Sequence, residues 1–180
     1  MGSNPMKKHN LAFVDIEATG LNLLNHEIIE IGGVITTPDF AVIEEFDLKI
    51  KPQNLESADK VSLKISNYDE TKWKNAISLK EAMELFSQKV KDCIMVGHNV
   101  SFDSGFLEHA FAKTGVLNSM HYHKLDTISI AWAKLHRAPD LEHFSLRELC
   151  LRFGIKNEQS HTALSDARAT FLLYKKLLEL

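Results

Sequence analysis

The chain has 180 residues, of which 44% are hydrophobic and 25% are charged, with only 8 glycines and 4 prolines. This balance is typical of one compact globular domain and excludes a disordered chain, a collagen and a coiled-coil array. No apolar stretch approaches the roughly 18 residues of a membrane helix, so we expect no membrane partner. The net charge of −3 excludes a protein that coats nucleic acid non-specifically, so such a partner would be held at one local site.

The two cysteines and the first residues bear on location and domain organisation. Cys93 and Cys150 are too few for a disulfide framework, and neither belongs to a CxxC pair that would bind zinc. We therefore expect a reducing, cytoplasmic location. Residues 1–10 are expected to be a disordered leader or an expression remnant, because the apolar run after them ends at Asp15, too early for a signal peptide. Residues 11–180 are expected to form a single domain, as a monomer or a homodimer.

The predicted elements follow one another without a linker. The first three strands are rich in Ile, Val and Phe and have short, turn-prone connections, which favours an antiparallel meander. After Pro52 the apolar spacing becomes helical, weakly at first and then clearly. The predicted strands are 11–17, 27–36, 40–50, 94–97 and 124–127, and the predicted helices are 57–73, 78–92, 101–113, 128–137, 145–153 and 162–180.

This order of elements predicts an α/β fold. Strands that are followed by alternating strands and helices favour a mixed central sheet, in which the meander is joined to parallel strands and helices flank both faces. The sequence has no GxGxxG and no Walker loop, so a dinucleotide-binding fold is not supported. The chemistry must therefore be sought in other polar residues.

Two acidic residues share one face of the first strand. Asp15 and Glu17 are two positions apart, so their side chains leave the same face, while Val14 and Ile16 leave the other. The pair is either the polar outer face of an edge strand or two carboxylates that converge on a site. The pattern alone does not decide, because DxE is short and common.

A third acid follows the motif Gly97-His98-Asn99. On the predicted helix 101–113, Asp103 lies on the apolar row, three and four positions before Phe106 and Leu107. The helix dipole favours an acid in the first turn in any case. A solvated acid would not need to share the apolar row, however, so we expect Asp103 to face the core.

The last helix carries a fourth acid. Asp166 is aligned with Ala169 and Thr170, so we expect it to face inward, where burial without a partner would be costly. His161 would lie about 140° round a continuous helix from Asp166. We therefore expect His161 in the loop before a Thr162 cap, turned back over the site.

These four acids predict a metal site. Carboxylates gathered from a strand and two helices cannot all stay ionised without positive charge among them. Their oxygens are hard ligands and no thiolate is nearby, which favours Mg²⁺ or Mn²⁺ over Zn²⁺. Two bound dications would make an otherwise repulsive cleft attractive to phosphate.

Three segments together resemble a known family. They are Asp15-Ile16-Glu17-Ala18-Thr19-Gly20-Leu21, His98-Asn99-Val100-Ser101-Phe102-Asp103 and His161-Thr162-Ala163-Leu164-Ser165-Asp166-Ala167. In order and approximate spacing they are similar to the DEDDh family of 3'-to-5' exonucleases, which has a ribonuclease H-like fold. The resemblance covers almost the whole chain, including the predicted strand around Leu125-Asp126-Thr127.

The resemblance implies a set of site residues and a reaction. Asp15, Glu17, Asp103 and Asp166 would bind two divalent metal ions, Mg²⁺ or Mn²⁺, and His161 would be the general base. The expected reaction releases nucleoside 5'-monophosphates from the 3' end of single-stranded nucleic acid. The implied substrate-binding residues are Ala18, Thr19, Gly20, Leu21, His98, Asn99 and Phe102. Among them Leu21 would wedge against the terminal base, and His98 is either a packed histidine or a substrate contact.

Three functional interpretations stay open. A proofreading or repair exonuclease on DNA, similar to the polymerase III epsilon subunit, is slightly favoured and could act with a DNA polymerase. The second is an RNA-trimming enzyme of the ribonuclease T or oligoribonuclease type. The third, of another class, is a non-catalytic nucleic-acid-binding adaptor with the same fold, against which the intact set of four acids and one histidine argues.

Two smaller patterns are weaker. Between residues 60 and 74, lysines alternate with Tyr68 and Trp73, which suits contact with nucleic acid. A solvated surface with its aromatic side chains tucked underneath is the favoured interpretation. His121 and His123 are read as surface residues rather than a zinc site, because no further ligand clusters with them.

Overall fold

The chain folds around one mixed sheet of five strands. The structure, a computed structural model, describes residues 5–157 and 161–180. The strands are β1 (Leu11–Ala18), β2 (Ile28–Thr36), β3 (Val42–Lys49), β4 (Ile94–Gly97) and β5 (Lys124–Asp126), in the sheet order β3-β2-β1-β4-β5. Strands β1 to β3 pair antiparallel, whereas β4 is parallel to both β1 and β5. The predicted meander joined to parallel strands is confirmed.

The helices lie close to their predicted ranges, with one exception. They are α1 (Lys60–Ile65), α2 (Leu79–Lys89), α3 (Val100–Thr114), α4 (Thr127–Leu135), α5 (Leu146–Phe153) and α6 (Ala163–Leu178), with 3-10 turns at Pro5–Lys8 and Leu55–Ser57. The weakly predicted helix at 57–73 is reduced to α1. Asp59 caps the start of α1 by accepting hydrogen bonds from Val61 and Ser62, and Asn67, with a φ of 51°, lies just beyond its end.

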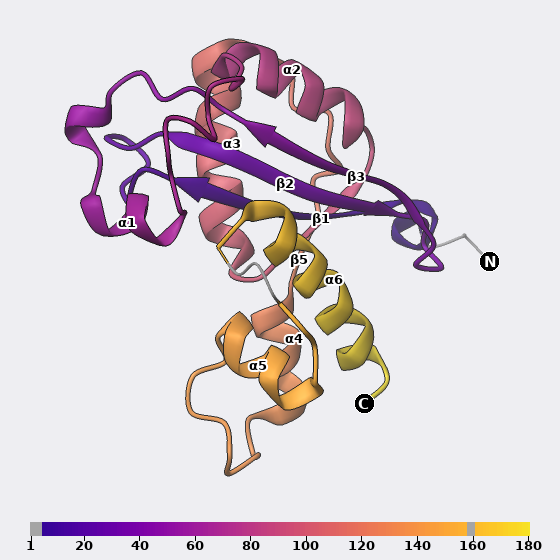
Figure 1. Cartoon of the computed structure of the whole chain (residues 1–180). Helices are drawn as coiled ribbons and strands as arrows, with labels where there is room; N and C mark the ends of the chain where they lie inside the picture. The colour runs from indigo at the N-terminus through magenta and orange to yellow at the C-terminus, as the bar shows by residue number, and fades with distance from the viewer. Residues whose placement is uncertain (1–4, 158–160) are drawn as a thin grey trace.

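Helices cover both faces of the sheet (Figure 1). Val14 and Ile16 pack with residues of α2 and α3 on one face. On the other face, the ring of Phe13 contacts Phe171 and Tyr174 of α6 at centroid distances of 5.0 and 5.5 Å. Helices α4 and α5 pack against the outer part of α6. Because side chains alternate along β1, Asp15 and Glu17 lie on the face that α6 covers.

The first turn of α6 crosses the sheet at very close range. A Cβ atom added to Gly32 of β2 would lie 2.1 Å from the carbonyl carbon of Ala163, so only glycine fits there. Gly32 pairs with Asp15 in the sheet register. This contact therefore sets the start of α6, and with it Asp166, beside the acidic residues of β1.

Part of the expected leader packs on the domain. Residues 1–4 lie outside the described residues. His9 Nδ1 donates to the carbonyl of Asp92 at 2.8 Å, and the carbonyl of Asn10 accepts from the N–H of Ile94 at 2.9 Å. His9 and Asn10 therefore contact the start of β4. None of the helices in the described ranges has the length and apolar character to cross a membrane.

Candidate active site

The predicted site residues lie where the carboxyl ends of β1, β4 and β5 meet. Asp15 and Glu17 are near the end of β1, the His98-Asn99 turn follows β4, and Asp126 is the last residue of β5. Asn99 has left-handed backbone geometry, and its N–H donates to Asp126 Oδ1 at 3.0 Å. This edge of a parallel arrangement is where ligands bind in many α/β proteins.

Asp103 is the most deeply buried of the four predicted ligand acids, with 3% of its surface exposed. Strand β4 pairs with β1 only as far as Phe13, so the N–H of Ile16 has no hydrogen-bond partner on β4. Asp103 Oδ1 accepts a hydrogen bond from this N–H at 3.0 Å and takes the place of a strand partner. Burial raises the pKa of Asp103 to about 7, although the hydrogen bond from Ile16 opposes that shift.

Asp15 and Glu17 are half-buried and crowded by other acids. Burial is the largest cause that raises the pKa of Asp15 well above its ordinary value, followed by the charges of Asp103, Asp166 and Glu17. Burial, followed by the charges of Asp166 and Glu30, raises the pKa of Glu17 to about 8. The sheet thus gathers carboxyl groups that disfavour one another's ionisation.

Asp166 and His161 meet this pair from the start of α6. One oxygen of Glu17, one of Asp166 and one ring nitrogen of His161 all lie within 4.8 Å of one another. The backbone N–H of His161, in a turn with a φ of 70°, donates to Asp166 Oδ2 at 3.1 Å. Asp166 is half-buried, on a row of α6 whose later members Ala169, Thr170 and Leu173 are buried.

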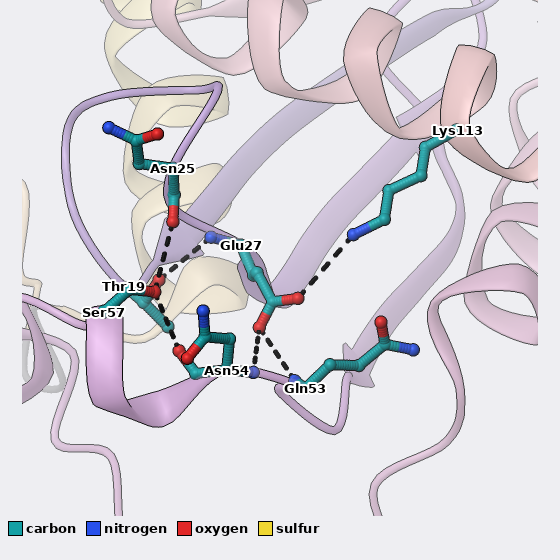
Figure 2. A network of polar contacts seen from close by, with 7 residues as sticks. All are labelled: Thr19, Asn25, Glu27, Gln53, Asn54, Ser57 and Lys113. Atoms are coloured by element: carbon teal, nitrogen blue, oxygen red, sulfur yellow. Dashed lines mark hydrogen bonds and ion pairs between the residues drawn. The ribbon is translucent and has the colours of Figure 1, made fainter.

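The segment after Glu17 is held by a polar network (Figure 2). Thr19 is fully buried, and its hydroxyl accepts from the N–H of Glu27 at 2.9 Å. The Glu27 carboxylate accepts from the N–H groups of Gln53 and Asn54 at 2.8 and 2.9 Å, and Lys113 Nζ lies 3.7 Å from its other oxygen. The loop from β1 to β2 is therefore rigid at its base.

The remaining residues of that segment differ in exposure. Ala18 is buried, and Gly20 packs against the ring of His26, where an added Cβ would lie 2.4 Å from Cε1. Leu21, in contrast, is 81% exposed. Of the four predicted substrate contacts in this loop, Leu21 is the one whose side chain is free to meet a base, and the others can contribute backbone.

The predicted substrate residues near β4 and α3 have different surroundings. The Nε2 of His98 donates to the carbonyl of Phe144 at 3.0 Å, and its Nδ1 lies 2.9 Å from the Thr127 hydroxyl. Burial lowers the pKa of His98, in keeping with a neutral ring that donates at one nitrogen and accepts at the other. This geometry favours the packed histidine over a direct substrate contact. Phe102 is half-buried against Phe106, with 5.0 Å between ring centroids.

Two residues near the acids were missed in the sequence. Glu30 pairs with Glu17 across the sheet and is 1% exposed, and its carboxylate lies 3.1 Å from Lys49 Nζ. The sequence did carry a signal for Glu30, because it is an acid within the predicted apolar strand 27–36. Asn157 donates from Nδ2 to Asp166 Oδ1 and accepts from the Ser165 hydroxyl. No periodicity or motif marks Asn157.

The two weaker patterns do not form further sites. Trp73 is 6% exposed, its Nε1 donates to the carbonyl of Ile29 at 2.9 Å, and Lys49 Nζ lies 4.5 Å from its ring centroid. The favoured interpretation, with aromatic side chains tucked under the surface, is confirmed for Trp73. Within 5–157 and 161–180, the group that could hold a metal is Glu17, His161 and Asp166, and it includes neither His121 nor His123.

Comparisons with known proteins give matches over most of the chain. The RNase T family model, described as an exonuclease, matches residues 12–174. DNA polymerase III PolC-type from Caldanaerobacter subterraneus subsp. tengcongensis is 32% identical over 165 residues, and the same protein from Listeria monocytogenes is 33% identical over 165 residues. Each alignment covers 92% of this chain and 11% of the relative, so the chain spans about a tenth of their length.

Solved structures show the same fold. Exonuclease I from E. coli in complex with a dT13 oligonucleotide has a TM-score of 0.80 at 18% identity, over 94% of this chain and 41% of that chain. A moderately thermophilic exonuclease I from Methylocaldum szegediense also has a TM-score of 0.80, at 19% identity, over 95% and 40% of the two chains. The predicted α/β architecture, a mixed sheet flanked by helices, is confirmed.

Proposed function

The chain belongs to the RNase T-type family of 3'-to-5' exonucleases, and on this premise we propose that it removes nucleoside 5'-monophosphates from the 3' end of single-stranded nucleic acid. The observation that carries the proposal is the approach of Glu17, His161 and Asp166 to within 4.8 Å, with Asp15 and Asp103 beside them. We further propose that residues 11–180 form a single exonuclease domain.

The residues present fit a pair of divalent metal ions. The four acids offer hard oxygen ligands without a thiolate, which favours Mg²⁺ or Mn²⁺. In the part of the chain that the structure describes, no lysine or arginine forms an ion pair with Asp15, Glu17, Asp103 or Asp166. The raised pKa of Glu17 shows how poorly the pocket tolerates this charge on its own. We assign these four acids as the metal ligands.

The chain's own residues would then act as follows. When bound, the dications supply the positive charge that lowers the pKa of the attacking water and offsets charge on the leaving 3' oxygen. His161 accepts the proton of that water as general base, and its exposed ring can pass the proton to solvent. The hydrogen bond from the His161 backbone to Asp166 holds the base at a fixed place beside a ligand. The backbone of residues Ala18, Thr19 and Gly20 would contact the 3' end of the substrate.

Single-stranded DNA is the substrate that we favour. The curated relatives are DNA polymerases, and a structural neighbour is described in complex with a dT13 oligonucleotide. Leu21 is exposed on a rigid loop base beside the acids and suits contact with a terminal base. By the same kinship we propose that the chain works beside a DNA polymerase in the cytoplasm. RNA trimming is the alternative.

Matched DNA and RNA oligomers with a 5' label test the proposal. With Mg²⁺ or Mn²⁺ we expect labelled products that shorten from the 3' end, faster for DNA, and none in EDTA. Equal rates on RNA would favour the RNA-trimming alternative. Tight binding of oligomers without any nucleotide release would contradict the enzyme assignment and favour the adaptor.

A further inference from the structure

A large aromatic side chain is exposed on the helix that begins at the site. In residues 5–157 and 161–180, the exposed large aromatic side chains are Trp132 at 57% and Tyr122 at 81%. Trp132 stacks over His136 at a centroid distance of 5.9 Å and contacts Phe144 at 5.2 Å. An indole left half in water on an otherwise ordered cluster is suited to a flat, apolar ligand.

This cluster is tied directly to the candidate active site. The carbonyl of Phe144 accepts the hydrogen bond from His98, in the turn that also carries Asn99. At the start of α4, Asp126 receives the Asn99 N–H on one oxygen and the Ser129 hydroxyl on the other. Ser129 and Trp132 are three residues apart and so lie on one side of the helix. A track of hydrogen bonds and one helix face therefore leads from the His98-Asn99 turn to the indole.

The distance along this track points to a base upstream of the terminal one. Trp132 follows Asp126 by six residues, which is about 9 Å of helical rise. The terminal nucleotide is expected at the acids and Leu21, at the near end of the track. A strand that leaves the site along α4 would bring a later base over the indole.

Positive charge near the cluster fits a phosphate backbone. Lys134, Arg137 and Arg147 are exposed, and no ion pair among the described residues occupies any of them. Of the acids near them along the chain, Asp140 is paired with Arg152, Glu148 accepts hydrogen bonds from the backbone N–H groups of Glu142 and His143, and Glu142 is exposed. In a chain of net charge −3, free cations beside an exposed aromatic face are the combination that single-stranded nucleic acid uses.

We propose that Trp132, supported by His136 and Phe144, is a stacking platform for an upstream base of the single strand whose 3' end occupies the active site. This proposal rests on the proposed function and names the part of the substrate that extends beyond the scissile bond. Because every base has a stackable face, the platform should be indifferent to sequence and sensitive to substrate length.

The test compares substrates of different length in Trp132→Ala, Trp132→Phe and Tyr122→Ala. Tyr122 is the matched control, a more exposed aromatic residue that precedes the start of β5, whereas Trp132 follows the end of this strand. For a DNA of eight nucleotides we expect KM to rise roughly 5- to 150-fold in Trp132→Ala, little in Trp132→Phe and not at all in Tyr122→Ala. For the p-nitrophenyl ester of thymidine 5'-monophosphate, which has no upstream base, all three should match the wild type. An equal KM on the long substrate for Trp132→Ala overturns the proposal.

Fluorescence gives a second readout that does not depend on turnover. Trp73 is buried, so quenching of tryptophan emission by a dT oligomer in EDTA should report Trp132 and disappear in Trp132→Phe. No quenching at concentrations that saturate the anisotropy of a labelled oligomer would overturn the platform. The platform would also be overturned if a Trp132 variant lost binding of a protein partner while its KM for long DNA stayed unchanged, because the exposed indole would then serve that partner. If the wild type cleaves neither substrate, the proposed function fails, and the quenching experiment still decides the platform.

Discussion

Loading the acidic site with metal should release protons, because the metal-free carboxyl groups hold them at neutral pH. A group with a pKa of about 8, such as Glu17, is about 0.9 protonated at pH 7, and one with a pKa of about 7, such as Asp103, is about half protonated. Asp15 adds to this total because its pKa is also raised. Binding of Mn²⁺ at pH 7 should therefore release more than about one proton, and apparent affinity should rise with pH between 6 and 8.

The proton count can be measured by calorimetry of Mn²⁺ binding in two buffers of different ionisation enthalpy. Glu17→Gln should reduce the count, because it removes a carboxyl group whose pKa is about 8 and relieves part of the shift of Asp15. Glu84→Gln, which changes an exposed acid on α2, should leave the count unchanged. A wild-type count near zero would refute the reasoning, since it would mean that the gathered carboxyl groups are already ionised.

The same shifts predict how stability depends on pH, and three substitutions test the site. For the metal-free protein, the stabilisation from a protonated Glu17 is complete below its ordinary pKa of 4.5 and is lost as pH rises through about 8, so Mg²⁺ should raise Tm more at pH 8 than at pH 5.5. Asp103→Asn keeps an oxygen for the Ile16 N–H, so it should lose turnover while its Tm is retained; a wild-type rate would end the ligand assignment. His161→Gln removes the proposed general base and should lower turnover at saturating metal by about 100-fold or more without preventing metal binding; a wild-type rate would remove His161 from the role. Gly32→Ala should lower the free energy of unfolding by about 1–3 kcal/mol and slow turnover, because the added Cβ displaces α6. In the control Gly105→Ala the added Cβ meets only Leu23 at 3.7 Å, so thermal melts and nuclease assays should both match the wild type.

The fold and the principal acids could be predicted because each carries a local signal. The DxE spacing fixed Asp15 and Glu17 to one face of β1, and the apolar row of α3 indicated that Asp103 turns inward. Those signals depend on the periodicity of strands and helices, which does not depend on how the elements pack together. The same periodicity placed Asp166 on the row of α6 that continues into the buried Ala169 and Thr170, but periodicity does not state how deeply the first turn of a helix is buried, and Asp166 is half-buried.

Contacts between loops, and pairings set by register, could not be predicted. Glu30 lies opposite Glu17 only in the observed register, which a bulge between Glu17 and Ala18 interrupts. Asn157 reaches Asp166 from an irregular segment that has no repeating pattern. The indole N–H of the buried Trp73 donates to the carbonyl of Ile29, 44 residues away in the sequence. The lysines that surround Trp73 in the sequence do not indicate this partner.

The placement of Lys49 explains how the sheet can gather so much acid and still leave it available. In the observed register Glu17, Glu30 and Lys49 lie side by side on three neighbouring strands. The lysine is two strands from Glu17, about 10 Å at the usual strand spacing, and its ammonium group pairs with Glu30 and lies over Trp73. It therefore offsets part of the charge of Glu30, which still raises the pKa of Glu17, and it forms no ion pair with Glu17 itself. A lysine one strand closer would neutralise Glu17 permanently, and the carboxylate would then be a poor ligand for a dication.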